Sequence, residues 1–322
     1  MKTSTKVWLI IAVVLVLLGA FAVFGVLAAN DWQLPSSAVA KYETRSFDIT
    51  EAFTDISVEA DTENIRLVPA PDGKCRVEFY NESKKEVSAA VQNGTLTVRS
   101  LDPREWHDRF TLFSFGSPGP AITVYLPNTE YGAVKISEHT GDVDIPSDFT
   151  FASVDIAVTT GDVQCNASAA GPISIKTDTG SIRMNSAKAQ ALTLSVTTGH
   201  IMVSSGEFTD IGVSVSTGRA TISDTSCESL TSTGSTGDLN LTGVIASGKL
   251  FVKRSTGHVR FDMCDAAELE VETDTGDITG SLLTEKVFIA KTDTGRIEVP
   301  ETTAGGKCKL TTDTGDIKIE IP

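Results

Sequence analysis

The chain has 322 residues, a formal net charge of −15 and an aromatic content of 7%. Such an acidic protein lacks the basic face that nucleic acid or an anionic bilayer would need, which excludes electrostatic binding to either. The recurrence of Thr, Ser, Asp, Val and Ile favours strands and turns over helices.

The first predicted element is a membrane anchor within residues 1–29. Val7–Leu27 is an uncharged apolar run long enough to cross a bilayer as a helix. Lys2 and Lys6 precede it and Asp31 follows it, so the positive-inside rule predicts a cytoplasmic N-terminus and an extracellular C-terminal domain. A cleaved signal peptide is the alternative, since "VLAAN" offers small residues for cleavage, although its apolar region would be unusually long. We expect a single-pass protein of the cell membrane, with residues 30–40 as a linker.

Residues 41–130 are predicted to form an irregular β cap and opening coils. Alternating apolar and polar positions, separated by turn signals such as "PDG" and "NG", indicate short strands. The candidate strands are 46–49, 55–60, 64–70, 74–80, 94–100 and 121–127. Their irregular spacing suits a cap, because the terminal edge of a stacked β structure has to be covered.

An aromatic-rich insertion interrupts these strands between residues 102 and 120. The candidate binding loop within it consists of Trp106, Arg109, Phe110, Phe113 and Phe115. Aromatic faces on a surface loop are suited to stacking on sugar rings or on a protein partner. The alternative, which we favour, is a lid whose aromatic side chains plug the open end of the stack, because every such stack needs a cap.

From residue 131 to residue 322 the chain repeats itself. Thr-Gly pairs recur every 19 or 20 residues, at corner glycines Gly141, Gly161, Gly180, Gly199, Gly218, Gly237, Gly257, Gly276, Gly295 and Gly315. Apolar positions at fixed offsets alternate with polar ones, so each copy supplies two short strands around a corner. Stacking the copies buries the apolar columns. We therefore predict an all-β fold, a parallel β-solenoid (β-helix) of about ten 19–20-residue coils.

Two polar columns support this register. The residues directly after six of the corner glycines alternate between basic and acidic: Arg219, Asp238, His258, Asp277, Arg296 and Asp316. Four residues before the glycine, Lys253, Glu272 and Lys291 alternate in the same way. This alternation is expected if each coil lies directly over the next one in chain order.

The acidic corners, such as "TDTGD" at 273–277 and 312–316, have two interpretations. Glycine allows the backbone of a tight turn, and Asp and Thr side chains can satisfy its free amides. A calcium ladder is the alternative, because Asp274, Asp293 and Asp313 are expected along one edge. Calcium needs about 6–8 oxygens, and calcium-binding β-rolls use a glycine-rich nonapeptide that this chain lacks. We therefore expect structural corners, with no metal site and no cofactor.

Catalysis is not expected from the motifs. The four histidines are scattered, and the sequence has no His-Glu-x-x-His motif, Gly-x-Ser-x-Gly elbow or phosphate-binding loop. Acidic residues fall in repeat columns rather than in the isolated pair that glycoside cleavage uses. The five cysteines form neither a metal-ligand pattern nor a disulfide framework, and Cys165 and Cys308 fall in apolar columns as core residues.

The chain ends in "DIKIEIP", one strand after the last corner. Lys318, Glu320 and Pro322 protect a strand edge, yet no capping helix follows. Homo-oligomerisation or strand addition at Ile317–Ile321 is therefore a hypothesis.

The sequence resembles the bacterial putative-adhesin family of β-strand-repeat proteins, whose domain is of unknown function. The resemblance rests on the leading apolar segment, on "AITVYLP" followed by "VKISEHTGDVDI", and on the serial "TGD", "TGS" and "TGR" corners, and it covers residues 45–322. It implies a membrane-anchored, extracytoplasmic β-helix, and some members are similar to the Lia-type accessory proteins of envelope-stress signalling. The family offers no catalytic or ligand residues to carry over.

The sequence thus predicts a non-catalytic binding or adhesion scaffold at the bacterial cell envelope. Its expected partner is a cell-wall polymer, another cell or an envelope protein. An accessory regulator of envelope-stress signalling is the second hypothesis, and a polysaccharide-active β-helix enzyme is the third.

Overall fold

The computed structural model describes residues 42–83, 85–101 and 119–322, together with residues 12, 14–19, 21, 24, 25 and 28. The chain divides into two units, Met1–Tyr42 with Pro103–Pro118 and Glu43–Asp102 with Gly119–Pro322. Near the N-terminus the described residues are helical. None of the helices that the described residues form is both long and apolar enough to cross a bilayer. Most of the predicted anchor, and the whole linker at 30–40, lie outside the described residues.

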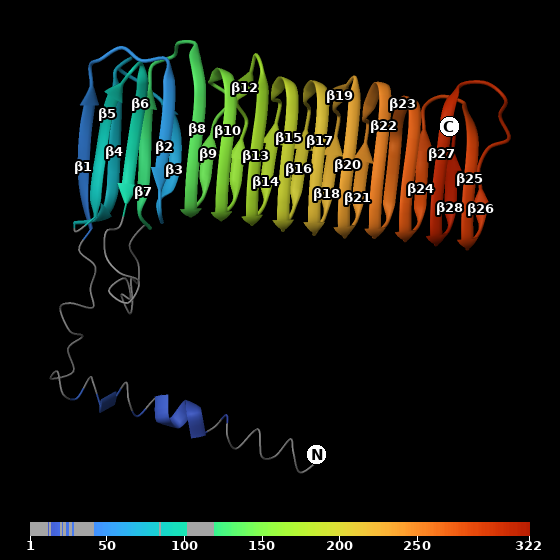
Figure 1. The fold of residues 1–322 in the computed structure, drawn as a ribbon, viewed down its shortest axis with the longest axis horizontal. Helices are drawn as coiled ribbons and strands as arrows, with labels where there is room; N and C mark the ends of the chain where they lie inside the picture. The colour runs from blue at the N-terminus through green and yellow to red at the C-terminus, as the bar shows by residue number, and fades with distance from the viewer. Residues whose placement is uncertain are drawn as a thin grey trace. The chain divides into compact units, whose positions relative to one another are not determined.

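The second unit is a parallel β-solenoid, as predicted (Figure 1). Each coil has a long strand that ends at a Thr-Gly corner and a short strand after it. The long strands are β8 (Tyr131–Thr140), β10 (Thr150–Thr160), β13 (Pro172–Thr179), β15 (Lys188–Thr198), β17 (Glu207–Thr217), β20 (Ser229–Thr236), β22 (Ile245–Thr256), the second half of β23 (Val259–Thr275), β25 (Lys286–Thr294) and β27 (Gly306–Thr314). The short strands are β9 (Val143–Ile145), β11 (Val163–Cys165), β14 (Ile182–Asn185), β16 (Ile201–Ser204), β18 (Ala220–Ser223), β21 (Leu239–Thr242), the first half of β23, β24 (Ile278–Leu282), β26 (Ile297–Glu298) and β28 (Ile317–Glu320). Two further short strands, β12 (Ser168–Ala169) and β19 (Ser226–Cys227), each precede a long one. The solenoid has about nine turns, where the repeats in the sequence predict about ten coils.

The register of the strands follows the period of the sequence. Val154 pairs with Val134 on one side and Ile173 on the other, and Val163 pairs with Val143 and Ile182. Apolar columns therefore stack on themselves and form one core along the solenoid. A shift by one residue would turn every apolar side chain outward, so the alternation itself holds the register.

The corner glycines form a column of their own. Nine of the ten, all but Gly141, have φ between 130° and 155°, which is a conformation that other residues rarely adopt. A Cβ on Gly199 would also overlap the carbonyl oxygen of Gly180 in the preceding coil. The corner thus needs glycine both for its backbone angle and for the close approach of successive coils.

The residue after each glycine mainly satisfies a backbone amide of the next coil. Asp142 Oδ1 accepts a hydrogen bond of 2.8 Å from the Asp162 amide, and His258 Nδ1 accepts one of 3.0 Å from the Asp277 amide. Predicted charge contacts within this column are also present, with 3.9 Å between Arg219 Nη2 and Asp238 Oδ2. Because these side chains are exposed or only half-buried, their hydrogen bonds to the backbone contribute more to the stacking than their charges do.

At the N-terminal end the coils do not follow chain order. β2 (Asp55–Ala60) and β3 (Asn64–Pro69) form one coil, and β6 (Thr95–Leu101) and β7 (Ala121–Leu126) form the next. β2 lies between β6 and β8, and β3 lies between β7 and β9. The first coil of the chain is thus inserted between the second and the third.

Antiparallel strands cover this N-terminal end. β5 (Glu86–Gln92) pairs antiparallel with β6, β4 (Cys75–Glu82) pairs antiparallel with β7, and β1 (Tyr42–Ile49) pairs with β4. β5 was absent from the predicted strands. Its half-buried positions are occupied by Val87, Ala89 and Val91. The small Ala89 and Ala90 between the two valines blur the alternation of apolar and polar residues in this segment.

At the C-terminal end, too, two coils have exchanged places relative to chain order. β27 lies between β23 and β25, and β28 lies between β24 and β26. The last coil of the chain is therefore interior, and β25 with β26 forms the end of the solenoid (Figure 1). The prediction that Ile317–Ile321 is an exposed edge is wrong, because β28 is paired on both sides and both Ile317 and Ile319 are buried.

The exchange also breaks both predicted charge columns. In the column after the corner glycines, Asp316 lies between Asp277 and Arg296, since the Asp316 amide donates to Asp277 Oδ1 at 2.9 Å and the Arg296 amide donates to Asp316 Oδ1 at 2.8 Å.

The column four residues before the glycines changes as well. Glu272 contacts Lys253 at 3.5 Å, as expected for neighbouring coils. Its other expected neighbour, Lys291, is displaced because Thr311 of the inserted strand lies between them. Glu272 instead contacts Lys309 of that strand at 3.3 Å.

All five cysteines are buried and free. Cys165 and Cys308 are wholly buried in the core columns to which the sequence assigned them.

Candidate functional site

A cavity of about 740 Å³ lies at the capped N-terminal end of the solenoid. Three turns line it: residues 48–53 between β1 and β2, residues 72–76 before and at the start of β4, and residues 127–131 between β7 and β8. The middle turn follows from the "PDG" signal, since Gly73 has φ 68° and its amide donates to the Ala70 carbonyl oxygen at 3.2 Å. The end of the solenoid therefore gathers turns that are far apart in the sequence.

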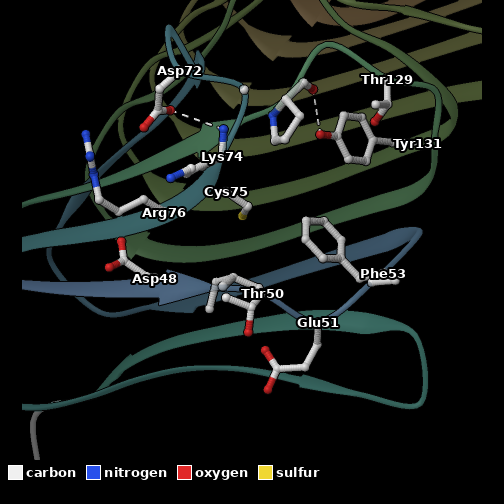
Figure 2. A pocket seen from close by; sticks show the side chains of 14 residues that line it. Asp48, Thr50, Glu51, Phe53, Asp72, Lys74, Cys75, Arg76, Thr129 and Tyr131 are labelled. Atoms are coloured by element: carbon white, nitrogen blue, oxygen red, sulfur yellow. Dashed lines mark hydrogen bonds between the residues drawn. The ribbon is translucent and has the colours of Figure 1, made fainter.

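The apolar part of the cavity is an aromatic pair beside a thiol. The rings of Phe53 and Tyr131 are stacked with centroids 6.0 Å apart. Tyr131 is buried against Phe149 and Phe151, and its hydroxyl donates a hydrogen bond of 2.7 Å to the Pro127 carbonyl oxygen. Figure 2 shows Cys75 between this pair and the charged side of the cavity. Because Tyr131 is buried and held by these contacts, it supports the half-buried Phe53 ring, which is the accessible aromatic surface of the pair.

The charged part is mostly exposed and of mixed sign. Asp48, Glu51 and Asp72 provide carboxylates, and Lys74 and Arg76 provide cations. Asp72 Oδ1 accepts a hydrogen bond of 3.1 Å from the Lys74 amide, which fixes that turn (Figure 2).

Arg76 is already held by its neighbours. Its guanidinium lies 4.5 Å from the centre of the Tyr125 ring and pairs with Glu78 at 3.0 Å. No ion pair involves Asp48, Glu51 or Lys74 among the described residues, so these three side chains remain available to a ligand.

The two weakly acidic groups of the cavity stay protonated. Burial raises the pKa of the Cys75 thiol to about 11, and burial also raises the pKa of the Tyr131 hydroxyl. A thiol attacks as its thiolate, so Cys75 is a poor nucleophile near neutral pH. The arrangement suits binding: an aromatic surface beside carboxylates that accept hydrogen bonds.

The predicted site residues are distributed differently. Trp106, Arg109, Phe110, Phe113 and Phe115 lie outside the described residues. The neighbouring Pro120 lies at the corner edge of the solenoid, where its carbonyl oxygen accepts a hydrogen bond of 2.9 Å from the Asn64 amide. The cavity opens at the opposite edge, on the turns that lead into the long strands.

The corner glycines are structural, as described above. The aspartates of the "TDTG" corners do not converge, and among the described residues no three His, Cys, Asp or Glu side chains are grouped so that they could hold a metal ion. The cavity residues were not predicted as a site. The "PDG" turn was the available signal, but it does not reveal which other turns lie beside it.

Comparisons with known proteins place the chain in a family. The sequence profile of the Toastrack DUF4097 family matches residues 53–244 and 210–322. No curated protein matches the sequence.

Two solved structures illustrate the likeness at low identity. A putative adhesin of Bacteroides fragilis is 14% identical with a TM-score of 0.44, and the alignment covers 88% of this chain and 99% of that one. A putative lipid binding protein of Parabacteroides distasonis is 13% identical with a TM-score of 0.45, covering 87% and 97% of the two chains. Identities this low transfer no function to this chain.

The profile matches span residues 53–322 and bear out the resemblance seen in the sequence. The chain belongs to the Toastrack DUF4097 family.

Proposed function

We propose that the protein is a membrane-anchored, extracytoplasmic binding scaffold at the bacterial cell envelope. The apolar run at residues 7–27, flanked by Lys2 and Lys6 on one side, supports an anchor with the N-terminus in the cytoplasm. Each coil is hydrogen-bonded along its strands to the neighbouring coils, which supports a rigid platform rather than a mobile enzyme domain. The anchor holds this platform at the cell surface.

The cavity at the capped end is the observation that carries a binding role. Phe53, supported by the buried Tyr131, offers an apolar face, while Asp48 and Glu51 offer acceptors without ion-pair partners among the described residues. A saccharide unit of a wall polymer has matching chemistry, with an apolar ring face and hydroxyl donors around it. Lys74 in the same cavity adds a contact for a carboxylate or phosphate on such a polymer.

The full chain in detergent micelles can test this with soluble peptidoglycan fragments and isothermal titration calorimetry. Replacing both acceptors, Asp48→Asn with Glu51→Gln, should weaken binding at least tenfold, because it removes charged acceptors from the rim. The matched control is Asp155→Asn, an exposed aspartate on β10 away from the cavity, which should change affinity less than twofold. A second pair has the same design: Lys74→Met, in the cavity, should weaken binding, and Lys135→Met, at an exposed position on β8, is its control.

Three results would overturn this reading. Absence of binding by the parent chain would remove the wall polymer as the ligand. Release of shortened fragments during incubation would show a polysaccharide-active enzyme. Recovery of one membrane protein from envelopes, with no retention of polymer, would favour the accessory regulator of envelope-stress signalling.

A further inference from the structure

The solenoid ends in an unpaired strand edge at β25. β25 pairs with β27 on one side, and no strand among the described residues pairs with its other side. Apolar side chains remain accessible there: Val287 is 39%, Ile289 is 52% and Ile297 is 44% exposed. The opposite end is covered by antiparallel strands, so the two ends of the molecule are not equivalent. Open apolar edges tend to recruit another strand.

The backbone groups that face the open side follow from the pairing on the closed side. The Gly315 amide donates a hydrogen bond of 2.9 Å to the Thr294 carbonyl oxygen, so the backbone N–H and C=O groups of Thr294 face the neighbouring strand β27. Backbone groups alternate in direction along a strand. The backbone groups of Val287, Ile289 and Lys291 therefore face away from β27, and they have no partner strand among the described residues.

The loop at residues 299–305 leads from β26 to β27. Its hydrogen bond to β25 is at the start of that strand, where the Thr302 hydroxyl donates to the Lys286 carbonyl oxygen. A partner strand can therefore pair with β25 after Lys286.

We propose that the partner is a second copy of this chain, whose β25 pairs antiparallel with β25 around a twofold axis at Phe288. In this register Val287 lies opposite Ile289 of the second copy. Glu285 lies opposite Lys291 of the second copy. Phe288 meets its own equivalent in a non-hydrogen-bonded pair, where side chains on facing strands approach most closely. The half-exposed ends of the two cores would thereby cover each other.

Charge selects this register over its neighbours. An axis at Ile289 would place Glu285 opposite Asp293, and an axis at Val287 would place Glu285 opposite Ile289. Of these three axes, only the one at Phe288 gives opposite charges twice, once on each side of the apolar centre. An axis at Thr292 would also pair Lys291 with Asp293. It would, however, place Ile289 opposite the corner Gly295 instead of an apolar side chain.

Glu285 is exposed and takes part in no ion pair among the described residues. Lys291 is exposed and pairs with Asp293 of its own strand at 3.0 Å, so Glu285 of the second copy would be a second acidic neighbour.

The twofold arrangement also closes on itself. A β25–β25 pair uses the same edge of both copies, so this edge is consumed on each chain and pairing through it stops at two copies. This moves the predicted self-association from Ile317–Ile321 to β25. The assembly does not depend on what the cavity binds.

The test is the protein mass of the full chain in detergent micelles, measured by light scattering with the detergent contribution subtracted. The parent should have twice the chain mass of 34.1 kDa, and Ile289→Lys should have the single mass because it places a charge opposite Val287. Met202→Lys is the matched control: Met202 is 39% exposed on β16, which is paired on both sides, so this variant should keep the double mass.

A charge exchange tests the register. Glu285→Lys places like charges opposite each other twice and should raise the dimer dissociation constant at least tenfold. The double variant Glu285→Lys with Lys291→Glu should recover most of the parent value. A parent of single mass, an Ile289→Lys variant that stays double, or no recovery in the double variant would each overturn the proposal as stated.

Discussion

Arg254 Nη2 donates a hydrogen bond of 2.8 Å to Ser232 Oγ inside the solenoid core, where both residues are buried. Arg254 Nη1 donates to the Thr233 carbonyl oxygen at 3.0 Å and occupies the space that a Cβ on Gly234 would need. Burial lowers the pKa of Arg254 to about 10. Ser232 departs from the apolar pattern of its column, and Gly234 leaves its own column without a side chain; one long side chain from the next coil explains both.

Ser232→Ala should therefore destabilise the parent protein but not an Arg254→Met background. In the parent it removes an acceptor from a buried guanidinium, at a cost of about 2 kcal/mol. Without the guanidinium the hydroxyl has no cation to satisfy. Melting temperatures of the four proteins check this, with Ser214→Ala, an exposed serine one coil earlier, as control. Equal losses in the two backgrounds would show that Ser232 and Arg254 act independently.

Gly199→Ala should lower stability by about 3 kcal/mol or more, because it combines a strained backbone angle with overlap against the preceding coil. Gly199 has φ 144°, and its added Cβ would meet the Gly180 carbonyl oxygen. Gly212→Ala is the control, since the nearest atom to its added Cβ is 3.9 Å away. Thermal unfolding of the two variants should separate clearly, and a Gly199→Ala protein as stable as the control would contradict the assigned role of the corners.

Stability should fall as pH rises through the range in which Glu138 ionises. Burial raises the pKa of Glu138 from 4.5 to about 8. The carboxyl is 2% exposed, with Oε2 lacking a hydrogen-bond partner and Glu63, itself paired with Lys85 at 2.8 Å, nearby. Between these two pKa values the folded state binds more protons than the unfolded state, so its stability decreases with increasing pH.

Glu138→Gln should remove this dependence. The amide oxygen can still accept the hydrogen bond from the Thr140 amide, which is 3.0 Å in the parent. Above pH 8 the variant should be more stable than the parent, by an amount on the order of a few kcal/mol, since each pKa unit corresponds to ~1.4 kcal/mol. Melting temperature against pH for the two proteins gives the comparison; parallel curves would mean that another group titrates.

The exchanged order of the last two coils can be trapped with disulfides. Lys309 is the register partner of both Glu270 and Ile289, so cysteines at 270 and 309, or at 289 and 309, should be one strand spacing of about 4.8 Å apart. Cysteines at 270 and 289 should be about 9.6 Å apart, beyond the ~4.4–6.8 Å that a disulfide spans. Mild oxidation followed by non-reducing mass analysis should cross-link the first two pairs only. Efficient cross-linking of the third pair would indicate coils in chain order.

The apolar columns show why the solenoid was predictable from local pattern. Val154, Ile173 and their equivalents recur at a period that fits one coil, and a repeated pattern has one economical way to bury itself, which is to stack on its own copies. Cys165 and Cys308 could be assigned to the core for the same reason, although neither is a typical core aliphatic.

The candidate site was not predictable in this way. Phe53, Cys75 and Tyr131 lie on three separate turns, and none belongs to a repeated column that would place it beside the others. Nor does the sequence distinguish the exchanged coils from coils in chain order. Lys291 and Lys309 are each acceptable neighbours for Glu272, and only the path of the chain at the end of the solenoid selects Lys309.

The residues alone predict the all-β class, the 19–20-residue coil, the inward columns and the glycine corners, because each follows from side-chain period and the close packing of identical units. Three features became visible only in the folded chain: the order of coils at both ends, the identity of the free edge and the composition of the cavity. Those features depend on which equivalent strands lie next to each other. Equivalent coils offer nearly the same backbone hydrogen bonds and apolar columns, so local pattern cannot choose among them.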